Sequence, residues 1–163
     1  MFRAPTTLAL TALMFTAAGY TAYAETKAAP EKPVSPAEAK VRQVVEQHID
    51  GIVNADIEKL NKSWDTKTGK INFVAKNRWG RDVVHTSPIT DSFKLWTESK
   101  IRGTRGDIQS IDVVNDKMAM VKAKVTWKGQ VFDDYLVLLN TDDGWRLVSK
   151  TYTSKSAAPY YGG

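Results

Sequence analysis

The chain of 163 residues contains no cysteine, and this absence removes two common ways of holding a fold together. Neither disulfides nor thiolate metal sites can form, so an apolar core must stabilise the protein. Histidine is also scarce, with two residues in the chain. Because a metal site needs three or four clustered ligands, the sequence argues against a bound metal.

Several motifs that mark common enzymes are missing as well. The sequence has no Gly-Ser nucleophile elbow, no phosphate-binding loop and no dinucleotide fingerprint, so we expect no cofactor. Positive charge is not concentrated either, because 23 Lys and Arg residues are interspersed with 18 Asp and Glu residues. Nucleic-acid-binding proteins usually gather their cations on one face or arm, and we therefore expect no nucleic-acid partner.

The one long apolar run lies near the N-terminus, from Leu8 to Ala18. Arg3 precedes this run and the small-residue pattern Ala22-Tyr23-Ala24 follows it, an order typical of a secretory signal peptide. The sequence thus predicts a signal peptide over residues 1–24 and a bacterial periplasmic or secreted location. Since the run is short and no second one follows, we expect no membrane insertion after cleavage.

The rest of the chain reads as a single domain with flexible ends. Residues 25–34 are rich in Ala, Pro, Lys and Glu, which predicts a flexible leader. We place the domain at residues 35–154 and a flexible tail at 155–163. The domain opens with Ser35-Pro36-Ala37-Glu38, a capping box that starts a helix.

Three helices are expected in the first half of the domain. The first carries an apolar stripe that includes one histidine; its members are Val41, Val44, Val45, His48, Ile49 and Ile52. The second begins after the cap Asp56 and runs to about Trp64. The third opens at residues 87–91, and its apolar residues are Ile89, Phe93 and Trp96.

A short strand at 70–75 and an extended piece within 77–84 separate the second helix from the third. After residue 106 the apolar period changes to two, which predicts four strands joined by tight turns. They cover about 107–114, 118–127, 131–140 and 145–153. This order favours an α+β fold in which about three helices cover one face of a curved antiparallel sheet.

Pairing across a Lys128-Gly129 turn places Ala123 opposite Asp134. Asp134 then lies on a face of core composition. With a two- or four-residue loop around Asp143-Gly144 the following strand puts Ser149 and Thr151 beside it, whereas a three-residue bulged loop would invert that strand. The opposite face includes an expected ion pair of Lys124 with Asp133, and Tyr135, Lys150 and Tyr152 are assigned to that face too. Its half-apolar composition favours a homodimer formed through the outer sheet face.

A buried carboxylate needs hydrogen-bond partners, a shifted pKa or a water-accessible cavity. We therefore predict a cavity near Asp134, with aromatic and small polar side chains around it. Its predicted ligand-binding residues are Trp64, Phe73, Phe93, Trp96, Trp127, Ser149 and Thr151. Asp134 and His48 are the candidate catalytic residues. The alternatives for Asp134 are a structural acid hydrogen-bonded to Ser149, Thr151 or the backbone, and an outward-facing acid in a different strand register. The alternative for His48 is a histidine hydrogen-bonded in or beside the core.

Three segments, 44–65, 87–96 and 132–152, carry a resemblance to a known family. The most specific is FDDYLVLLNTDDGWRLVSKTY, with its acid-Tyr-Leu strand and its Gly-Trp-Arg-Leu-Val continuation. The chain resembles the putative lumazine-binding branch of the nuclear transport factor 2-like (SnoaL-like) superfamily. This resemblance implies a cone-shaped fold with a pocket between sheet and helices, commonly in a dimer.

Three functions follow as hypotheses, since members of that superfamily include both enzymes and binding modules. The first is an exported domain that binds a small apolar or planar molecule. The second is a proton-transfer enzyme of the isomerase or dehydratase type, with Asp134 as base and His48 or Tyr135 assisting. The third is a non-catalytic dimeric accessory domain.

Overall fold

The computed structural model describes residues 33–156, so the predicted signal peptide lies outside the described residues. This part of the chain contains three helices, α1 (Pro36–Asn54), α2 (Ile57–Ser63) and α3 (Ile89–Thr97). Its strands are β1 (Lys70–Lys76), β2 (Asp82–Pro88), β3 (Arg105–Val114), β4 (Met118–Trp127), β5 (Gln130–Thr141) and β6 (Gly144–Ser156). None of the helices between residues 33 and 156 has the length and apolar character needed to span a bilayer.

Helix α1 begins as its capping sequence predicts. The Ser35 hydroxyl accepts a hydrogen bond of 3.1 Å from the Glu38 N–H, and Pro36 occupies the first turn, where no N–H is needed. The helix ends at Ala55, whose φ of 54° lies in the left-handed region. The predicted stripe is confirmed, and its fully or largely buried members are Val41, Val45, His48, Ile49 and Ile52.

The N-termini of the other two helices are capped differently. In α2 the Asp56 carboxylate accepts from the N–H groups of Glu58 and Lys59, at 3.0 and 3.1 Å. In α3 the N-cap position is Pro88, which makes no side-chain capping bond. Packing therefore holds α3, because its three predicted apolar residues, Ile89, Phe93 and Trp96, are all buried.

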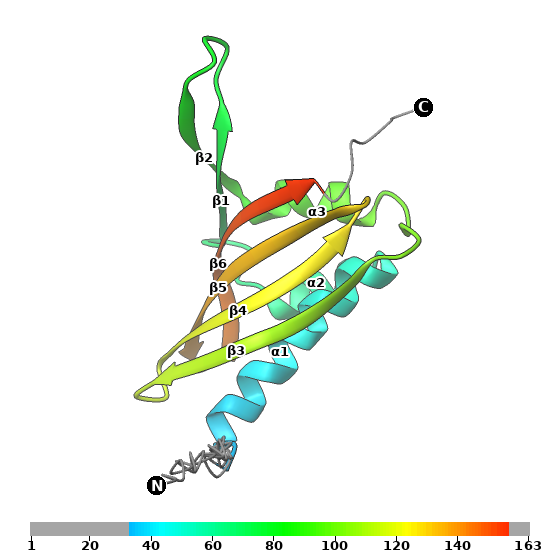
Figure 1. The fold of residues 1–163 in the computed structure, drawn as a ribbon. Coiled ribbons are helices and arrows are strands. Elements are labelled where there is room, and N and C mark those ends of the chain that lie inside the picture. The colour runs from blue at the N-terminus through cyan, green and yellow to red at the C-terminus, as the bar shows by residue number, and fades with distance from the viewer. Residues whose placement is uncertain (1–32, 157–163) are drawn as a thin grey trace, which may run out of the picture. The chain divides into compact units, whose positions relative to one another are not determined.

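The six strands form one sheet in the order β2-β1-β6-β5-β4-β3 (Figure 1). Strands β3 to β6 make the predicted antiparallel meander. The turn at Lys128-Gly129 has positive φ at both residues, as a two-residue hairpin requires, whereas Asn115 and Asp116, also with positive φ, belong to a three-residue loop between the paired Val114 and Met118. Strand β1 pairs with β6 in parallel, so the sheet is mixed and the prediction of a wholly antiparallel sheet was incomplete. The β1–β2 hairpin extends beyond the meander in Figure 1.

The pairing of β5 with β6 contains a bulge that the sequence pattern did not reveal. Leu138 lies opposite Leu147, whereas Val137 lies opposite Ser149, which leaves Val148 as an extra residue. A single extra residue exchanges the two faces of the strand beyond it. The C-terminal half of β6 is therefore inverted relative to the alternation that starts at Trp145.

This inversion corrects four predicted positions. Lys150 and Tyr152, assigned to the outer face, turn to the same side as Asp134. Ser149 and Thr151, predicted on the inner face beside Asp134, lie on the outer one. There Ser149 accepts a hydrogen bond from the Asn72 amide at 3.2 Å, and Thr151 is exposed.

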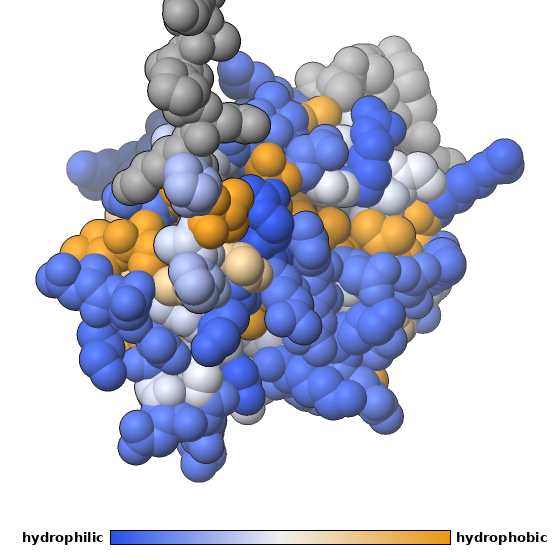
Figure 2. Space-filling model, turned by 90° about the horizontal axis from the view of Figure 1, so that it is seen from below, coloured by the Kyte–Doolittle hydropathy of each residue, from blue (hydrophilic) through white to orange (hydrophobic). Residues whose placement is uncertain are grey.

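The core lies between the helices and the inner sheet face. It combines the buried helix residues with side chains from β4, β5 and β6, among them Ala119, Val121, Ala123, Leu136, Leu138, Trp145 and Leu147. The opposite, outer face carries exposed apolar residues, namely Val114, Met118, Met120, Tyr135 and Leu139. At the end of the molecule shown in Figure 2, hydrophilic residues dominate and hydrophobic ones form smaller areas between them.

Candidate functional site

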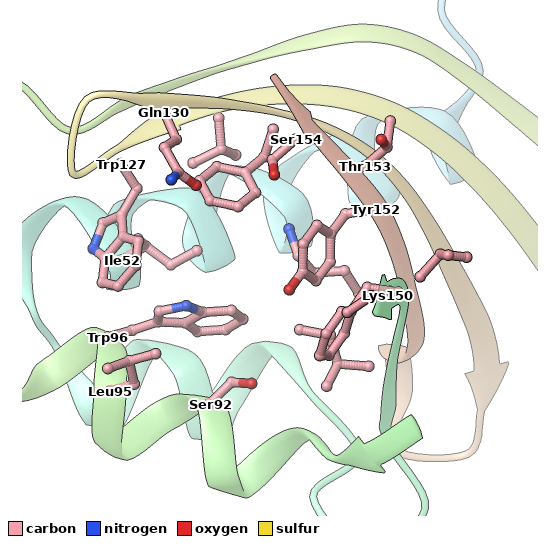
Figure 3. Close-up of a pocket in the computed structure, with 16 residues that line it drawn as sticks. Ile52, Ser92, Leu95, Trp96, Trp127, Gln130, Lys150, Tyr152, Thr153 and Ser154 are labelled. Atoms are coloured by element: carbon pink, nitrogen blue, oxygen red, sulfur yellow. The ribbon is translucent and has the colours of Figure 1, made fainter. Parts of the chain in front are cut away.

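A cavity of about 540 Å³ lies between α3, the C-terminal part of α1 and the inner side of the sheet. Its volume falls within the range typical of small-molecule sites. Figure 3 shows Trp96 extending from α3 into the space that Trp127, Gln130 and Tyr152 border from the strands. The cavity therefore combines residues from both layers of the fold, because two helices (α1 and α3) and four strands (β1, β4, β5 and β6) contribute to its wall.

Five aromatic residues line the wall. The rings of Phe73 and Tyr152 are stacked with centroids 5.2 Å apart, and Tyr152 meets Phe132 edge to face at 5.4 Å. Trp127 continues this row from β4, 6.5 Å from Phe132. Trp96 reaches the same space from α3. Such a lining suits a flat ligand, because aromatic faces offer offset stacking and large apolar contact areas.

Lys150 is the charged residue in this aromatic lining. Its side chain is 5% exposed, and its ammonium donates a hydrogen bond to the Asp134 carboxylate on β5. The same nitrogen lies 5.5 Å from the ring centroid of Tyr152 and 5.9 Å from that of Trp96, distances at which cation–π attraction contributes. One charged group is thus held at a defined place among aromatic rings and a few uncharged polar side chains.

Asp134 lies behind Lys150 and is completely buried. Its Oδ2 is paired with Lys150, while Oδ1 has no hydrogen-bond partner among the described residues. Burial raises the pKa of Asp134, although the charge of Lys150 opposes that rise, and burial lowers the pKa of Lys150. Both changes disfavour the charged forms, so the proton between the two groups is more evenly shared than in water.

His48 is buried on α1 and contacts two tryptophans. Its Nδ1 accepts a hydrogen bond of 3.1 Å from the indole N–H of Trp64, and its ring lies 5.5 Å from that of Trp96. The tautomer that accepts at Nδ1 carries its proton on Nε2, which has no partner within residues 33–156. Burial, and secondly the charge of Lys150, keep the pKa of His48 well below its usual value.

The two candidate catalytic residues are therefore not joined to one another. Asp134 is paired with Lys150, and His48 is hydrogen-bonded to Trp64. Neither belongs to the cavity wall, where Lys150 is the group that reaches the open space. The structure thus replaces the expected Asp/His arrangement with an Asp/Lys pair.

The predicted ligand-binding residues divide into three groups. Phe73, Trp96 and Trp127 line the cavity. Trp64 and Phe93 are packed in the core, 2% and 3% exposed. The outward-facing Ser149 and Thr151 form the third group, as described above.

Sequence reasoning missed Lys150 and Tyr152, the two residues most relevant to the chemistry of the site. Strict alternation along β6 placed them outside, and nothing in the sequence marks Val148 as a bulge. One feature of the sequence could have revealed the position of Lys150, namely that a buried Asp134 needs a cation nearby. A slip of one residue in β6 brings Lys150 inward, which would have satisfied that need.

Within residues 33–156, no group of three or more potential ligands is close enough to hold an ion.

Comparison with known structures defines the class of the protein. A protein of unknown function from Shewanella baltica, described as NTF2-like, aligns with a TM-score of 0.62 and 20% identity, over 72% of this chain and 92% of that one. An NTF2-like protein from Methylobacillus flagellatus gives a TM-score of 0.63 and 18% identity over 76% and 96%. At these identities the likeness establishes the fold, which is NTF2-like (nuclear transport factor 2-like).

A third neighbour is described as a putative dehydratase of the NTF2-like family from Streptomyces avermitilis. Its TM-score is 0.52 at 16% identity, over 73% of this chain and 96% of that one. No curated protein matches the chain.

The sequence profile of one family, described as putative lumazine-binding, matches residues 36–153. This match covers all the described helices and nearly all of the sheet. The chain therefore belongs to the putative lumazine-binding family, a branch of the NTF2-like fold, and the resemblance noted in the sequence is confirmed.

Proposed function

We propose that this domain binds a small, planar and uncharged molecule in the cavity beside Lys150. The observation that carries the proposal is the half-enclosed space of about 540 Å³, in which aromatic side chains surround one ion pair. Membership of a family described as lumazine-binding supports a small-molecule ligand.

The preference for an uncharged ligand comes from the balance of charge. Lys150 and Asp134 neutralise each other, and the remaining lining residues carry no charge. A ligand that brought its own net charge into this apolar space would lose hydration without gaining an unpaired counter-ion. Polar groups of the ligand can instead bond to the Gln130 amide and the Trp127 indole N–H, which lacks a partner among the described residues.

Fluorescence titration tests this function directly, because Trp96 and Trp127 line the cavity. We expect lumazine and 2-naphthylmethanol to quench the tryptophan emission in a saturable manner. Replacing Trp96 by Leu removes one stacking face and should weaken binding roughly fivefold, since an aromatic contact contributes about 1 kcal/mol beyond its area.

The matched control is Trp79→Leu. Trp79 is 68% exposed at the tip of the β1–β2 hairpin and stacks with the Arg78 guanidinium, away from the cavity. This variant should bind as the wild type does. Equal weakening by both substitutions, or the absence of saturable quenching by either compound, would contradict the proposed site.

A proton-transfer enzyme of the isomerase or dehydratase type is the alternative function. Its base would be Asp134, whose Oδ1 has no hydrogen-bond partner in the described part of the chain and whose pKa is raised by burial. The two assisting groups suggested by the sequence are poorly placed for this role. Tyr135 is 49% exposed on the outer face, and His48 is hydrogen-bonded to Trp64. The geometry therefore supports binding more strongly than this mechanism.

Export to the periplasm completes the proposal, and its support is the cation, apolar run and small-residue sequence of residues 1–24. In a bacterial host, the periplasmic fraction should contain a chain that begins at Glu25, as N-terminal sequencing would show. Retention of the uncleaved chain in the cytoplasm would contradict this assignment.

A further inference from the structure

Lys150 has hydrogen-bonding capacity that the described residues do not use. Within residues 33–156 its ammonium has one acceptor, the Asp134 carboxylate. Its other N–H bonds lie near the faces of Trp96 and Tyr152, which are apolar neighbours. Since Lys150 also belongs to the cavity wall, a ligand in the cavity meets a primary amine that is largely shielded from water.

A neutral carbonyl group suits this amine better than an anion does. Asp134 already balances the charge of Lys150, so an anionic ligand would place a second negative charge near a fully buried carboxylate. A carbonyl oxygen accepts an N–H bond without adding charge. The same contact brings the electrophilic carbonyl carbon close to the nitrogen of Lys150.

We propose that Lys150 forms a reversible imine with an aromatic aldehyde or ketone held in the cavity, while Asp134 carries the protons. This inference rests on the binding function proposed above. Attack by nitrogen forms the C–N bond as the carbonyl π bond opens, and the C–O bond then breaks to release water. Two protons of the ammonium leave with that oxygen. The product is a protonated imine opposite the Asp134 carboxylate, so charge and atoms balance without an oxidant or reductant.

The surroundings of the pair favour the neutral amine that this reaction requires. Burial lowers the pKa of Lys150 and raises that of Asp134, which makes proton transfer between them less costly than in water. A desolvated lysine in an apolar pocket is an established form of activated nucleophile. Tyr152 remains protonated beside it, because burial and the charge of Asp134 raise its pKa.

Reductive trapping tests the proposal, with 2-naphthaldehyde as the probe and 2-naphthylmethanol as its unreactive analogue. Sodium cyanoborohydride converts an imine into a stable secondary amine, which peptide mass spectrometry assigns to a residue. Lys124 is the matched control, since it pairs from β4 with Asp133, the neighbour of Asp134 on β5, at 3.8 Å, and its side chain is 48% exposed. We expect the adduct at Lys150 to form roughly tenfold faster than the adduct at Lys124.

Lys150→Arg provides the second control, because arginine keeps a cation opposite Asp134 and cannot form this imine. The variant should lose the adduct at this position, while the adduct at Lys124 should form at the wild-type rate. If it does not fold, the site of trapping in the wild-type protein decides the question alone.

The outcomes distinguish the two proposals. Trapping at Lys124 and other surface lysines, with Lys150 unmodified and the alcohol still quenching fluorescence, would overturn the imine and leave the binding function standing. Failure of both compounds to change the fluorescence would contradict the binding function and the imine together.

Discussion

At the scale of single residues, removing one member of the Asp134–Lys150 pair should destabilise the fold strongly, whereas replacing both members by apolar residues should not. Lys150→Met leaves a buried carboxylate without a partner, and we expect a loss of about 3–5 kcal/mol in the free energy of unfolding. Replacing both residues, by Asp134→Leu with Lys150→Met, should restore stability to within about 1 kcal/mol of the wild type or above it, because no buried charge remains. Urea denaturation measures both changes.

The exposed pair Lys124–Asp133 is the control for this experiment. Its nitrogen and oxygen are 3.8 Å apart and both side chains reach solvent, so Lys124→Met should change stability by less than about 1 kcal/mol. A double substitution at Asp134 and Lys150 that is as damaging as the single one would show that the pair itself stabilises the fold.

His48 should make the stability depend on pH. Its folded-state pKa is depressed by burial, so the unfolded chain binds the proton first as the pH falls below about 6.5. Its stabilising contribution is complete above that pH and declines toward the lower folded pKa, by at most about 1.4 kcal/mol per pH unit. In His48→Gln the amide can still accept the hydrogen bond from Trp64 but does not titrate. The free energy of unfolding, measured between pH 8 and 5, should therefore change less with pH in this variant than in the wild type.

The raised pKa of Asp134 acts in the opposite direction, since protonation of that group in the folded state adds stability as the pH falls. The difference between wild type and His48→Gln isolates the histidine, because both proteins keep Asp134. If the free energy of unfolding changed with pH equally in both proteins, His48 would have the same pKa in the folded and unfolded states.

At the scale of elements, the packing of α1 against α2 should be destabilised by one added methyl group at Gly51. A Cβ added to Gly51 would lie 2.8 Å from two side-chain atoms of the buried Leu60. Alanine gains about 1 kcal/mol over glycine in a helix, but overpacking a fixed neighbour costs about 1–3 kcal/mol, so Gly51→Ala should be destabilising on balance. Thermal unfolding measures this, and Gln43→Ala on the exposed side of α1 should be neutral. A stabilised Gly51→Ala would show that Leu60 has room to move.

The helices and turns also show which features of the fold could be predicted from the sequence. The capping box at Ser35, the Asp56 cap and the two-residue turn at Lys128-Gly129 are local signals, and the structure has all three where they were expected. The bulge at Val148 is different, because it leaves hydrophobic alternation intact on both sides and depends on which residues β5 offers across the strand. Asp134 was identified from its strand alone, whereas its partner required the pairing of two strands.

At the scale of the whole molecule, we propose that the protein forms a homodimer through the outer sheet face. Three adjacent strands bring apolar side chains together there: Met118 pairs with both Val114 and Leu139, and Met120 pairs with Val137. Exposed apolar residues that gather on one face in this way are typical of an interface. A two-fold axis through this sheet would place the face against its own copy and leave the cavity, on the inner side, free for ligand.

A charge at the centre of this face should separate the subunits. Met120 is 45% exposed in the single chain, and Met120→Lys would place two ammonium groups near the two-fold axis of the dimer, where they repel each other and lose water. We expect light scattering coupled to size-exclusion chromatography to give a dimer for the wild type and a monomer for Met120→Lys. Val84→Lys, at a residue that is 71% exposed on β2, is the matched control and should remain dimeric.

In both variants 2-naphthylmethanol should still quench the tryptophan emission, because neither residue lines the cavity. A wild-type protein that is monomeric at every concentration would contradict the interface, and a Val84→Lys monomer would move it to the β1–β2 hairpin.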